Sequence, residues 1–313
     1  MSLIKALVIA GPTTSGKSDL AVSVAEEFNG VVINGDSMQL YKGLETISAA
    51  PSNTLRARVP HKLYTIRDPA YPCSAGQWVE LAKKEIFATH NAGMLPIIVG
   101  GTGLYLKALM SGISKIPPIS NKIRDTLRLR IQSEGNAALH AELFKTDPET
   151  AKKLNISDSQ RILRALEVYQ MTGKTLQQWH KERDDQVGGP EFEFNSVLLR
   201  PPRKQLYANC NARFERMVKA GAIEEVQALV KRGLDPNLPA MKALGVPEIL
   251  LYLNGSLSLE EAILAGQLAT RHYVKRQETW FNNQFISEIN INTQYNFKNN
   301  LEIFPFIIKF LLT

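Results

Sequence analysis

The stretch LVIAGPTTSGKSDLA, residues 7–21, decides the fold. It contains GPTTSGKS, Gly11 to Ser18, which fits the P-loop pattern of a glycine, four residues, Gly-Lys and Ser or Thr. Its glycines, Gly11 and Gly16, let backbone N–H groups turn inward around phosphate oxygens, and the helix N-terminus that follows adds positive dipole. Lys17 supplies a mobile positive charge, and the hydroxyl of Ser18 can hold Mg²⁺. The stretch therefore predicts a polyphosphate or diphosphate site.

The residues on either side of GPTTSGKS also fit a P-loop. An apolar, strand-like run precedes it and a helix-like run follows it, which is the arrangement that a P-loop requires. A chance glycine-rich turn explains this context less well. The motif alone leaves the ligand open, because the loop of a kinase or NTPase would cradle a diphosphate ester equally well.

The composition sets the class of protein. The chain has 313 residues, 44% of them hydrophobic, with a net charge of +7 and a pI of about 9.3, which favours an anionic partner. Its two cysteines, Cys73 and Cys210, are far apart and lack a CxxC or His-rich neighbourhood. This argues against a disulfide framework or a zinc site and fits a reducing cytoplasm.

Neither end of the chain predicts a membrane anchor. The apolar run at the start breaks at Gly11-Pro12, which is too short for a signal sequence. The tail FPFIIKFLLT is roughly half as long as a bilayer-spanning helix and is expected to pack or to end loosely ordered. We expect a cytoplasmic protein that acts as a monomer.

The first third of the sequence alternates strands and helices. Strands are predicted at residues 3–10, 31–34, 61–66 and 95–100, with helices at residues 17–28 and 77–91. Short apolar runs divided by helices predict a parallel sheet covered on both faces. The expected fold is a P-loop NTPase-like α/β core.

The sequence pattern changes after KIPPIS (residues 115–120), and this change indicates an insertion. Residues 121 to about 180 read as polar helices, one of which is expected to begin near Asp158 as its N-cap and to stop at Gly173. A strand returns at residues 194–202. Long helical stretches are predicted at residues 203–232 and 257–283. We divide the chain into a first core part (1–115), an all-helical insertion (116–193), a second core part (194–286) and a C-terminal tail (287–313).

Asp36 follows the second predicted strand, in VVINGDSMQLYKG (residues 31–43). Ligands gather at the carboxyl ends of parallel strands, so Asp36 and the P-loop are expected at the same crevice. Asp36 is there a candidate general base for an acceptor nucleophile. A magnesium ligand and a turn-capping Asp in Asn-Gly-Asp-Ser remain open alternatives.

Two further residues are expected near this edge of the sheet. Thr102 lies among three glycines in GGTGLYLKAL, where it is a small donor for the crevice or the N-cap of the next helix. Arg213 borders the apolar stripe of the helix at residues 203–232, and an inward arginine usually has an anionic partner. Arg271 is a similar but weaker candidate.

At this point the sequence resembles the bacterial tRNA dimethylallyltransferases. The resemblance covers residues 8 to about 283, in five blocks that occur in the family's order. These blocks are GPTTSGKS, GDSMQLYKG, VGGTGLYLKAL, QRILRALEVYQMTGKTL and RHYVKRQETWF.

The resemblance implies transfer of a dimethylallyl group from dimethylallyl diphosphate to the exocyclic amine of the adenine 3′ of the anticodon in tRNA. It implies a P-loop core and an insertion that grips the anticodon stem-loop, with Asp36 as base and Thr102 and Arg213 at the ester oxygen. The implied diphosphate-binding residues are Gly11, Pro12, Thr13, Thr14, Ser15, Gly16, Lys17 and Ser18. The implied tRNA contacts are Asp36, Ser37, Met38, Gln39, Thr102, Arg124, Gln160, Arg161, Ile162, Leu163 and Arg164.

The chemistry is consistent with this implication. Breaking an allylic C–O bond builds negative charge on the leaving diphosphate, which Mg²⁺, Lys17 and Arg213 can stabilise. The adenine amine is a weak nucleophile, so it needs positioning and loss of a proton. An adenine in an RNA loop must also be splayed out into a pocket, which the basic helices of an insertion would assist.

The sequence departs from the family pattern in two places. After the Asp-Ser loop it reads TISAAPS (residues 46–52), where the family often has Thr-Ala-Lys-Pro, so one lysine contact is missing. Val246 stands where an aromatic residue is common. The zinc-finger extension of eukaryotic relatives is also absent.

Three other functions compete with this hypothesis. A cytokinin-type enzyme would prenylate free adenine nucleotides with the same core, but a mononucleotide needs no helical grip. A P-loop small-molecule kinase would use Asp36 to activate a hydroxyl, and it requires neither GGTGLY nor an inward Arg213. A pure RNA-binding module would leave Lys17 and Ser18 idle.

Overall fold

The computed structural model describes residues 3–114, 116–184 and 191–313. The chain forms two compact units, one of Met1–Ser111 with Pro190–Thr313 and one of Gly112–Gly189. The first unit carries a β-sheet, and the described part of the second is built from helices.

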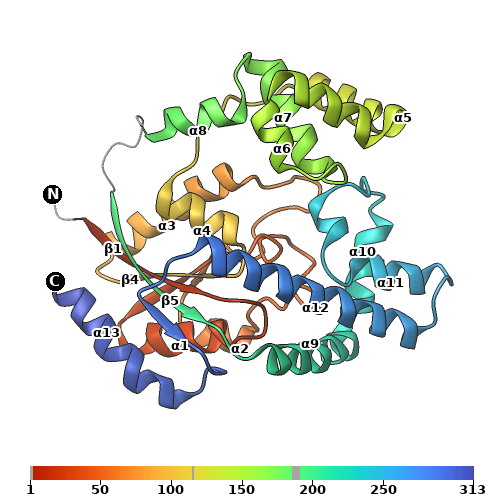
Figure 1. Ribbon diagram of the computed structural model, residues 1–313. Helices are drawn as coiled ribbons and strands as arrows, with labels where there is room; N and C mark the ends of the chain where they lie inside the picture. Colours follow the sequence, from red (N-terminus) through yellow and green to blue (C-terminus); the bar gives the residue numbers. More distant parts are fainter. Residues whose placement is uncertain (1–2, 115, 185–190) are drawn as a thin grey trace. The chain divides into compact units, whose positions relative to one another are not determined.

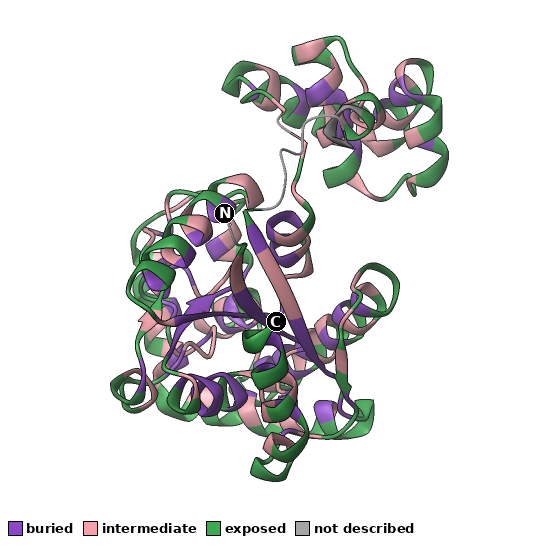
Figure 2. Cartoon of the chain, turned by 90° about the vertical axis from the view of Figure 1, so that its left-hand side faces the viewer, coloured by how far each residue is buried: buried purple, intermediate pink, exposed green. Residues whose placement is uncertain are grey.

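Within the described residues, the first unit contains a six-stranded sheet in the order β3-β2-β4-β1-β5-β6. Each pair of neighbouring strands is parallel, which confirms the predicted P-loop-like α/β core. The strands are β1 (Ile4–Ala10), β2 (Gly30–Asn34), β3 (His61–Lys62), β4 (Leu95–Gly100), β5 (Phe192–Leu199) and β6 (Ile289–Ile291). The interior strands β2 and β4 are buried along their whole length, because helices cover both faces of the sheet. Figure 2 shows buried strands between the helices of this unit.

Alternate residues of β1 supply the two hydrophobic cores. Leu7 and Ile9 pack with α1 (Lys17–Glu27) and α13 (Asn300–Leu312) on one face. Ala6 and Val8 pack on the other face with α3 (Ala75–Asn91) and α4 (Gly103–Ser111), together with Phe281 of α12 (Leu259–Gln284). Figure 1 shows the sheet between these two helix layers.

A third core forms beside the sheet. Helices α9 (Arg203–Met217), α10 (Ile223–Lys231) and α11 (Val246–Leu253) enclose it with the 3-10 turn Pro239–Lys242. Leu44 and Ile47, from the long loop after β2, are buried in this cluster. The loop that carries Asp36 is therefore anchored far from its own strand.

Two local predictions were wrong, and several elements were not predicted. The single helix expected over residues 203–232 is interrupted at Val218–Ala222, where Gly221 has φ 104° and breaks the helical path. The strand expected over residues 61–66 is only two residues long, because Leu63 and Thr65 adopt left-handed backbone. The tail forms β6, the 3-10 turn Phe297–Asn299 and α13, which were not foreseen, and α2 (Asn53–Arg58) was also missed.

The helical unit has a small core of its own. Its helices are α5 (Asn121–Thr146), α6 (Pro148–Lys153), α7 (Ser159–Thr172) and α8 (Leu176–Asp184). Gly135, with φ 81°, bends α5 so that Leu127 and Leu143 from its two halves share one apolar cluster. Asp158 caps α7 by accepting the N–H of Arg161 at 3.2 Å, which confirms the predicted start of that helix.

One structural finding concerns membranes. Across residues 3–114, 116–184 and 191–313, no helix combines the length and apolar character that crossing a bilayer requires.

Candidate active site

The P-loop joins β1 to α1 at the carboxyl edge of the sheet. Gly16 caps α1 with left-handed backbone at φ 96°. A Cβ atom on Gly11, whose φ is 148°, would lie 2.6 Å from the carbonyl oxygen of Leu199, so this strand end tolerates only glycine. Lys17 folds back over the loop, where its Nζ donates to the carbonyl of Pro12 at 2.6 Å. The loop therefore has the closed turn that its sequence predicts.

A cavity of about 480 Å³ opens over this loop, and we call it the phosphate cavity. Lys17 lines this cavity, and desolvation lowers the pKa of its amine to about 7, with Asp36 opposing this shift and Arg213 adding to it. Residues of the cavity wall include Thr13, Thr14, Gly16, Lys17, Ser18 and Gln39. An anion bound here would restore the charge of Lys17.

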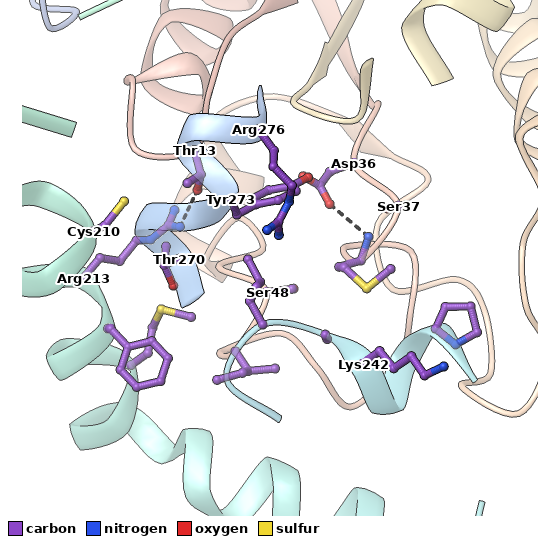
Figure 3. Close-up of a pocket in the computed structure, with 17 residues that line it drawn as sticks. Thr13, Asp36, Ser37, Ser48, Cys210, Arg213, Lys242, Thr270, Tyr273 and Arg276 are labelled. Atoms are coloured by element: carbon purple, nitrogen blue, oxygen red, sulfur yellow. Dashed lines mark hydrogen bonds between the residues drawn. The ribbon is translucent and has the colours of Figure 1, made fainter. Parts of the chain in front are cut away.

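A second cavity of about 310 Å³ adjoins the first. Figure 3 shows its lining side chains, which come from the loop after β2, from α9 and from α12. Ile47, Phe214 and Leu244 give it an apolar wall, whereas Tyr273 and Arg276 present polar groups. The residues that line both cavities are Thr13, Asp36, Ser48 and Arg213. The adjoining cavity is large enough for a small organic group.

Asp36 is held by its own turn and also faces both cavities. Its N–H donates to Oδ1 of Asn34 at 2.8 Å, and its Oδ1 accepts the N–H of Met38 at 2.9 Å. The indole of Trp78 donates to the carbonyl of Asn34 at 2.9 Å and fixes that residue in turn. The turn-capping interpretation and the functional one are compatible, because the cap occupies Oδ1 and the carboxylate still lines the cavities.

Thr102 joins two loops of the sheet edge. Its hydroxyl accepts the N–H of Ser37 at 3.0 Å and lies 3.3 Å from the Ser37 hydroxyl, to which it donates. Gly103, the first residue of α4, packs so closely that an added Cβ would lie 2.2 Å from the ring of Trp280. The sequence left Thr102 as a crevice donor or an N-cap, and the structure shows that its side chain positions the loop that carries Asp36.

Arg213 reaches the P-loop from α9. Its guanidinium donates a hydrogen bond to the hydroxyl of Thr13, and the side chain lines both cavities. Burial lowers the pKa of Arg213. The ordinary pKa of an arginine is so high that the side chain nevertheless stays cationic. Arg271, the weaker candidate, instead donates to the side chain of Asn211 at 2.7 Å.

Gln277 and Tyr273 of α12 also belong to the site, although neither was predicted from the sequence. The side-chain oxygen of Gln277 accepts the N–H of Thr13 at 2.8 Å, and its amide nitrogen donates to the carbonyl of Gly101 at 2.9 Å. Tyr273, one turn earlier, lines the adjoining cavity and has a pKa raised first by burial and then by the charge of Asp36. The signal was present, since helical spacing places residues 273 and 277 on one face of the block RHYVKRQETWF.

The other candidates on the loop after β2 also lie at the cavities. Ser37 and Met38 line the adjoining cavity. The amide of Gln39 donates to the carbonyls of Ser48 and Ala49, at 3.1 Å and 2.9 Å, and so binds to the segment TISAAPS. Ser48 is thus the residue that this unusual segment presents to both cavities.

Val246 is fully buried in the third core, so its side chain has a packing role.

The candidate tRNA contacts of the helical unit differ in accessibility. Gln160 and Arg161 are exposed on α7, and Arg161 lies 3.5 Å from Asp158. Arg164 lies 3.7 Å from Glu167, and Arg124 is half-buried on α5. Ile162 is a correction, because its side chain is fully buried in the core of the unit and unavailable to RNA. Leu163 is partly buried against the same cluster.

The donor set fits a magnesium ion shared with a phosphate ligand. In the described part of the chain, no group of three or more His, Cys, Asp or Glu side chains could hold a metal by itself. Ser18 is exposed at the phosphate cavity, and the carboxylate of Asp36 lines the same space. Mg²⁺ usually takes one or two oxygen ligands from the protein and the rest from phosphate and water. These residues fit that pattern.

The fold and site define a P-loop α/β protein in which an anion-binding loop, a cation and a carboxylate meet at two joined cavities. Sequence comparison makes this class more specific. Residues 39–284 match the family described as IPP transferase, and residues 4–64 match that described as isopentenyl transferase. The chain belongs to the IPP transferase family.

Its relatives include bacterial proteins named tRNA dimethylallyltransferase. One from Bradyrhizobium sp. is 48% identical over 280 residues, covering 90% of this chain and 92% of the relative. Another, from Rhodopseudomonas palustris, is 50% identical over 278 residues, covering 89% of each.

Solved structures agree with this assignment. The tRNA isopentenylpyrophosphate transferase of Bacillus halodurans aligns with a TM-score of 0.69 and 33% identity, over 98% of this chain and 96% of that one. A eukaryotic dimethylallyltransferase described as acting on tRNA aligns with a TM-score of 0.80 and 28% identity, over 96% of this chain and 76% of that one.

Proposed function

We propose that this protein transfers a dimethylallyl group from dimethylallyl diphosphate to the exocyclic amine of the adenine 3′ of the anticodon in tRNA, and releases diphosphate. The observation that supports this most directly is the boundary between the two cavities. Asp36 and Arg213 both line that boundary, so a leaving anion and an acceptor amine could meet beside a base and a cation. The names of the relatives point to the same reaction.

The proposed roles follow from the position of each residue. The phosphate cavity takes the diphosphate, where Lys17 and Arg213 stabilise the charge that develops as the allylic C–O bond breaks. The adjoining cavity takes the allyl group and the extruded adenine. As the new C–N bond forms, the amine loses a proton to Asp36. Ser18 would hold Mg²⁺, which when bound supplies further positive charge to the leaving group.

The helical unit is the proposed grip on the RNA. Gln160, Arg161 and Arg164 lie on one helix, and Arg124 on another, where they can contact the backbone of the anticodon stem-loop. The loop residues Ser37, Met38 and Gln39 would contact the adenine end of the same RNA. We further propose that the protein acts as a monomer in the cytoplasm.

A direct assay tests this function. The purified protein is incubated with labelled dimethylallyl diphosphate and Mg²⁺, together with unmodified tRNA, with a tRNA whose target adenine is replaced by guanine, or with AMP. We expect label in the first tRNA alone. Label in AMP alone would instead indicate a cytokinin-type enzyme. A parallel incubation with γ-labelled ATP tests the kinase alternative, for which phosphate transfer would replace prenyl transfer.

A further inference from the structure

The C-terminal segment, residues 285–313, belongs to the wall of the phosphate cavity. The family match ends at residue 284, and the segment follows it with β6 and α13. β6 extends the sheet beside β5, and α13 packs against α1. This places Gln294, between the two elements, among the residues that line the phosphate cavity.

Gln294 contacts the P-loop directly. Its Nε2 donates to the carbonyl of Thr14 at 3.2 Å, and its Oε1 accepts Nδ2 of Asn209, on α9, at 3.1 Å. Because the second bond takes the oxygen, it orients the amide so that the nitrogen faces Thr14. Two elements distant in sequence therefore act together on one peptide group of the loop.

That peptide group is in an unusual conformation. Thr14 has φ 65°, in the left-handed region, which is strained for a β-branched residue. Such a conformation persists only where the surroundings impose it. The hydroxyl of Thr14 donates to the carbonyl of Leu206 at 3.2 Å and lies 3.5 Å from Sγ of Cys210. Gln294 supplies the remaining contact, on the backbone itself.

The same segment also packs on the next turn of the loop. A Cβ atom on Gly16 would lie 2.8 Å from Cβ of Tyr295. The hydroxyl of Tyr295 donates to Oδ1 of Asn300 at 2.9 Å, and the amide of Asn300 donates to the hydroxyl of Ser23 in α1 at 2.8 Å. The loop and its helix are thus both held against the end of the chain.

We propose that Gln294 is a positioning residue for the diphosphate site. It holds Thr14 in the left-handed conformation, so that the N–H groups of residues 15–17 are arranged before the diphosphate binds. The choice of dimethylallyl diphosphate as substrate rests on the proposed function, whereas the role of Gln294 in anion binding does not.

The first test is Gln294→Met, which keeps the length of the side chain and removes the amide. We expect the KM for dimethylallyl diphosphate to rise by about 3- to 10-fold, as loss of one hydrogen bond suggests, with kcat and the KM for tRNA within about twofold. The affinity for inorganic diphosphate, measured by calorimetry, should fall by the same factor. Gln294→Glu should be worse, because its carboxylate cannot donate to Thr14 and repels the anion. Gln284→Met, at the exposed end of α12, is the matched control.

A second test separates positioning from direct contact. In a Thr14→Gly background the left-handed backbone carries no side-chain strain, so adding Gln294→Met should cost at most about twofold in diphosphate affinity. An undiminished loss in that background would mean that Gln294 touches the ligand itself and would overturn the positioning role. Unchanged diphosphate affinity in Gln294→Met alone would also overturn it. If the wild-type protein transfers no prenyl group, the proposed function fails, and the calorimetry still decides the role of Gln294.

Discussion

The guanidinium of Arg213 donates a hydrogen bond to the hydroxyl of Thr13, which lies 200 positions earlier in the sequence. The contact joins α9 to the P-loop and sets the cation at the boundary of the two cavities. A charge that is already fixed in place stabilises a leaving anion without the cost of reorganisation during the reaction. The two core parts therefore complete one site, although the helical unit separates them in sequence.

Asp36→Asn should reduce kcat by about 10²- to 10⁴-fold, because the amide cannot accept the proton of the adenine amine. The substitution preserves the size of the side chain and an oxygen for the N–H of Met38. The affinity for tRNA, measured by filter binding, should stay within about threefold of wild type. Asp68→Asn, at an exposed surface ion pair with Arg232, is the control and should keep full activity. Wild-type turnover in Asp36→Asn would remove the assignment of a base.

Lys17 should make diphosphate binding depend on pH. Its pKa is about 7 in the folded protein, against an ordinary value of 10.5, so the amine is largely neutral at pH 8. A bound anion restores the charge, so binding at pH 8 should take up protons and the affinity should decline above pH 7. Calorimetry in two buffers of different ionisation enthalpy measures this uptake. Lys17→Arg, which does not titrate, provides the baseline, and equal uptake in both proteins would contradict the shift.

The same shift has a consequence for stability. Between about pH 7 and 10.5 the unfolded chain keeps the proton of Lys17 and the folded protein does not. The unfolded state then binds more protons, so the contribution of Lys17 to the free energy of unfolding should rise with pH across this window. Urea denaturation at several pH values, compared with Lys17→Met, isolates that contribution.

Gln277→Met should affect both stability and activity. It removes the acceptor for Thr13 and the donor for Gly101, so the free energy of unfolding should fall by about 1–3 kcal/mol. Gln267→Met is a matched control, since both glutamines belong to α12, where Gln277 is only 5% and Gln267 only 6% exposed. Both variants should lose stability in denaturant, but only Gln277→Met should lose about tenfold or more in kcat/KM. Equal activities would show that Gln277 is structural alone.

Arg161→Ala combined with Arg164→Ala should weaken tRNA binding. Each lost phosphate contact should reduce the slope of log affinity against log salt by about 0.7–0.9. Arg58→Ala, which removes a surface arginine paired with Glu26 in the other unit, is the control and should leave the slope unchanged. Filter binding between 50 and 300 mM salt measures the effect, and an unaltered slope in the double variant would place the RNA elsewhere.

Local sequence signals predicted the core of the fold well. The apolar run before GPTTSGKS gave β1, and the P-loop pattern gave the turn and the start of α1 at Lys17. Asp158 and Gly173 marked the two ends of α7, because capping is decided by residues next to each other. The cavity-lining position of Asp36 followed from the rule that parallel strands share one carboxyl edge. That of Arg213 followed from its place beside the apolar stripe of its helix, where an inward arginine usually has an anionic partner.

What the sequence did not predict depends on contacts between distant residues. Gln277 is a polar residue in an otherwise ordinary helix until the fold brings Thr13 and Gly101 to its side chain. Gln294 lies in a short polar segment whose partners are residues 14 and 209. The break in the helix after α9 rests on one glycine, which a helical pattern tolerates, so its left-handed backbone was not foreseen.

The position of β1 between β4 and β5 has a consequence for synthesis on the ribosome. The first strand to emerge gains one neighbour when residues 95–100 appear and the other only with residues 192–199. The glutamine that steadies its loop arrives almost a hundred residues later still. The phosphate cavity therefore lacks part of its wall until residue 294 has been synthesised, and a premature stop codon ahead of that residue would yield a protein with the P-loop motif but without this part of the wall.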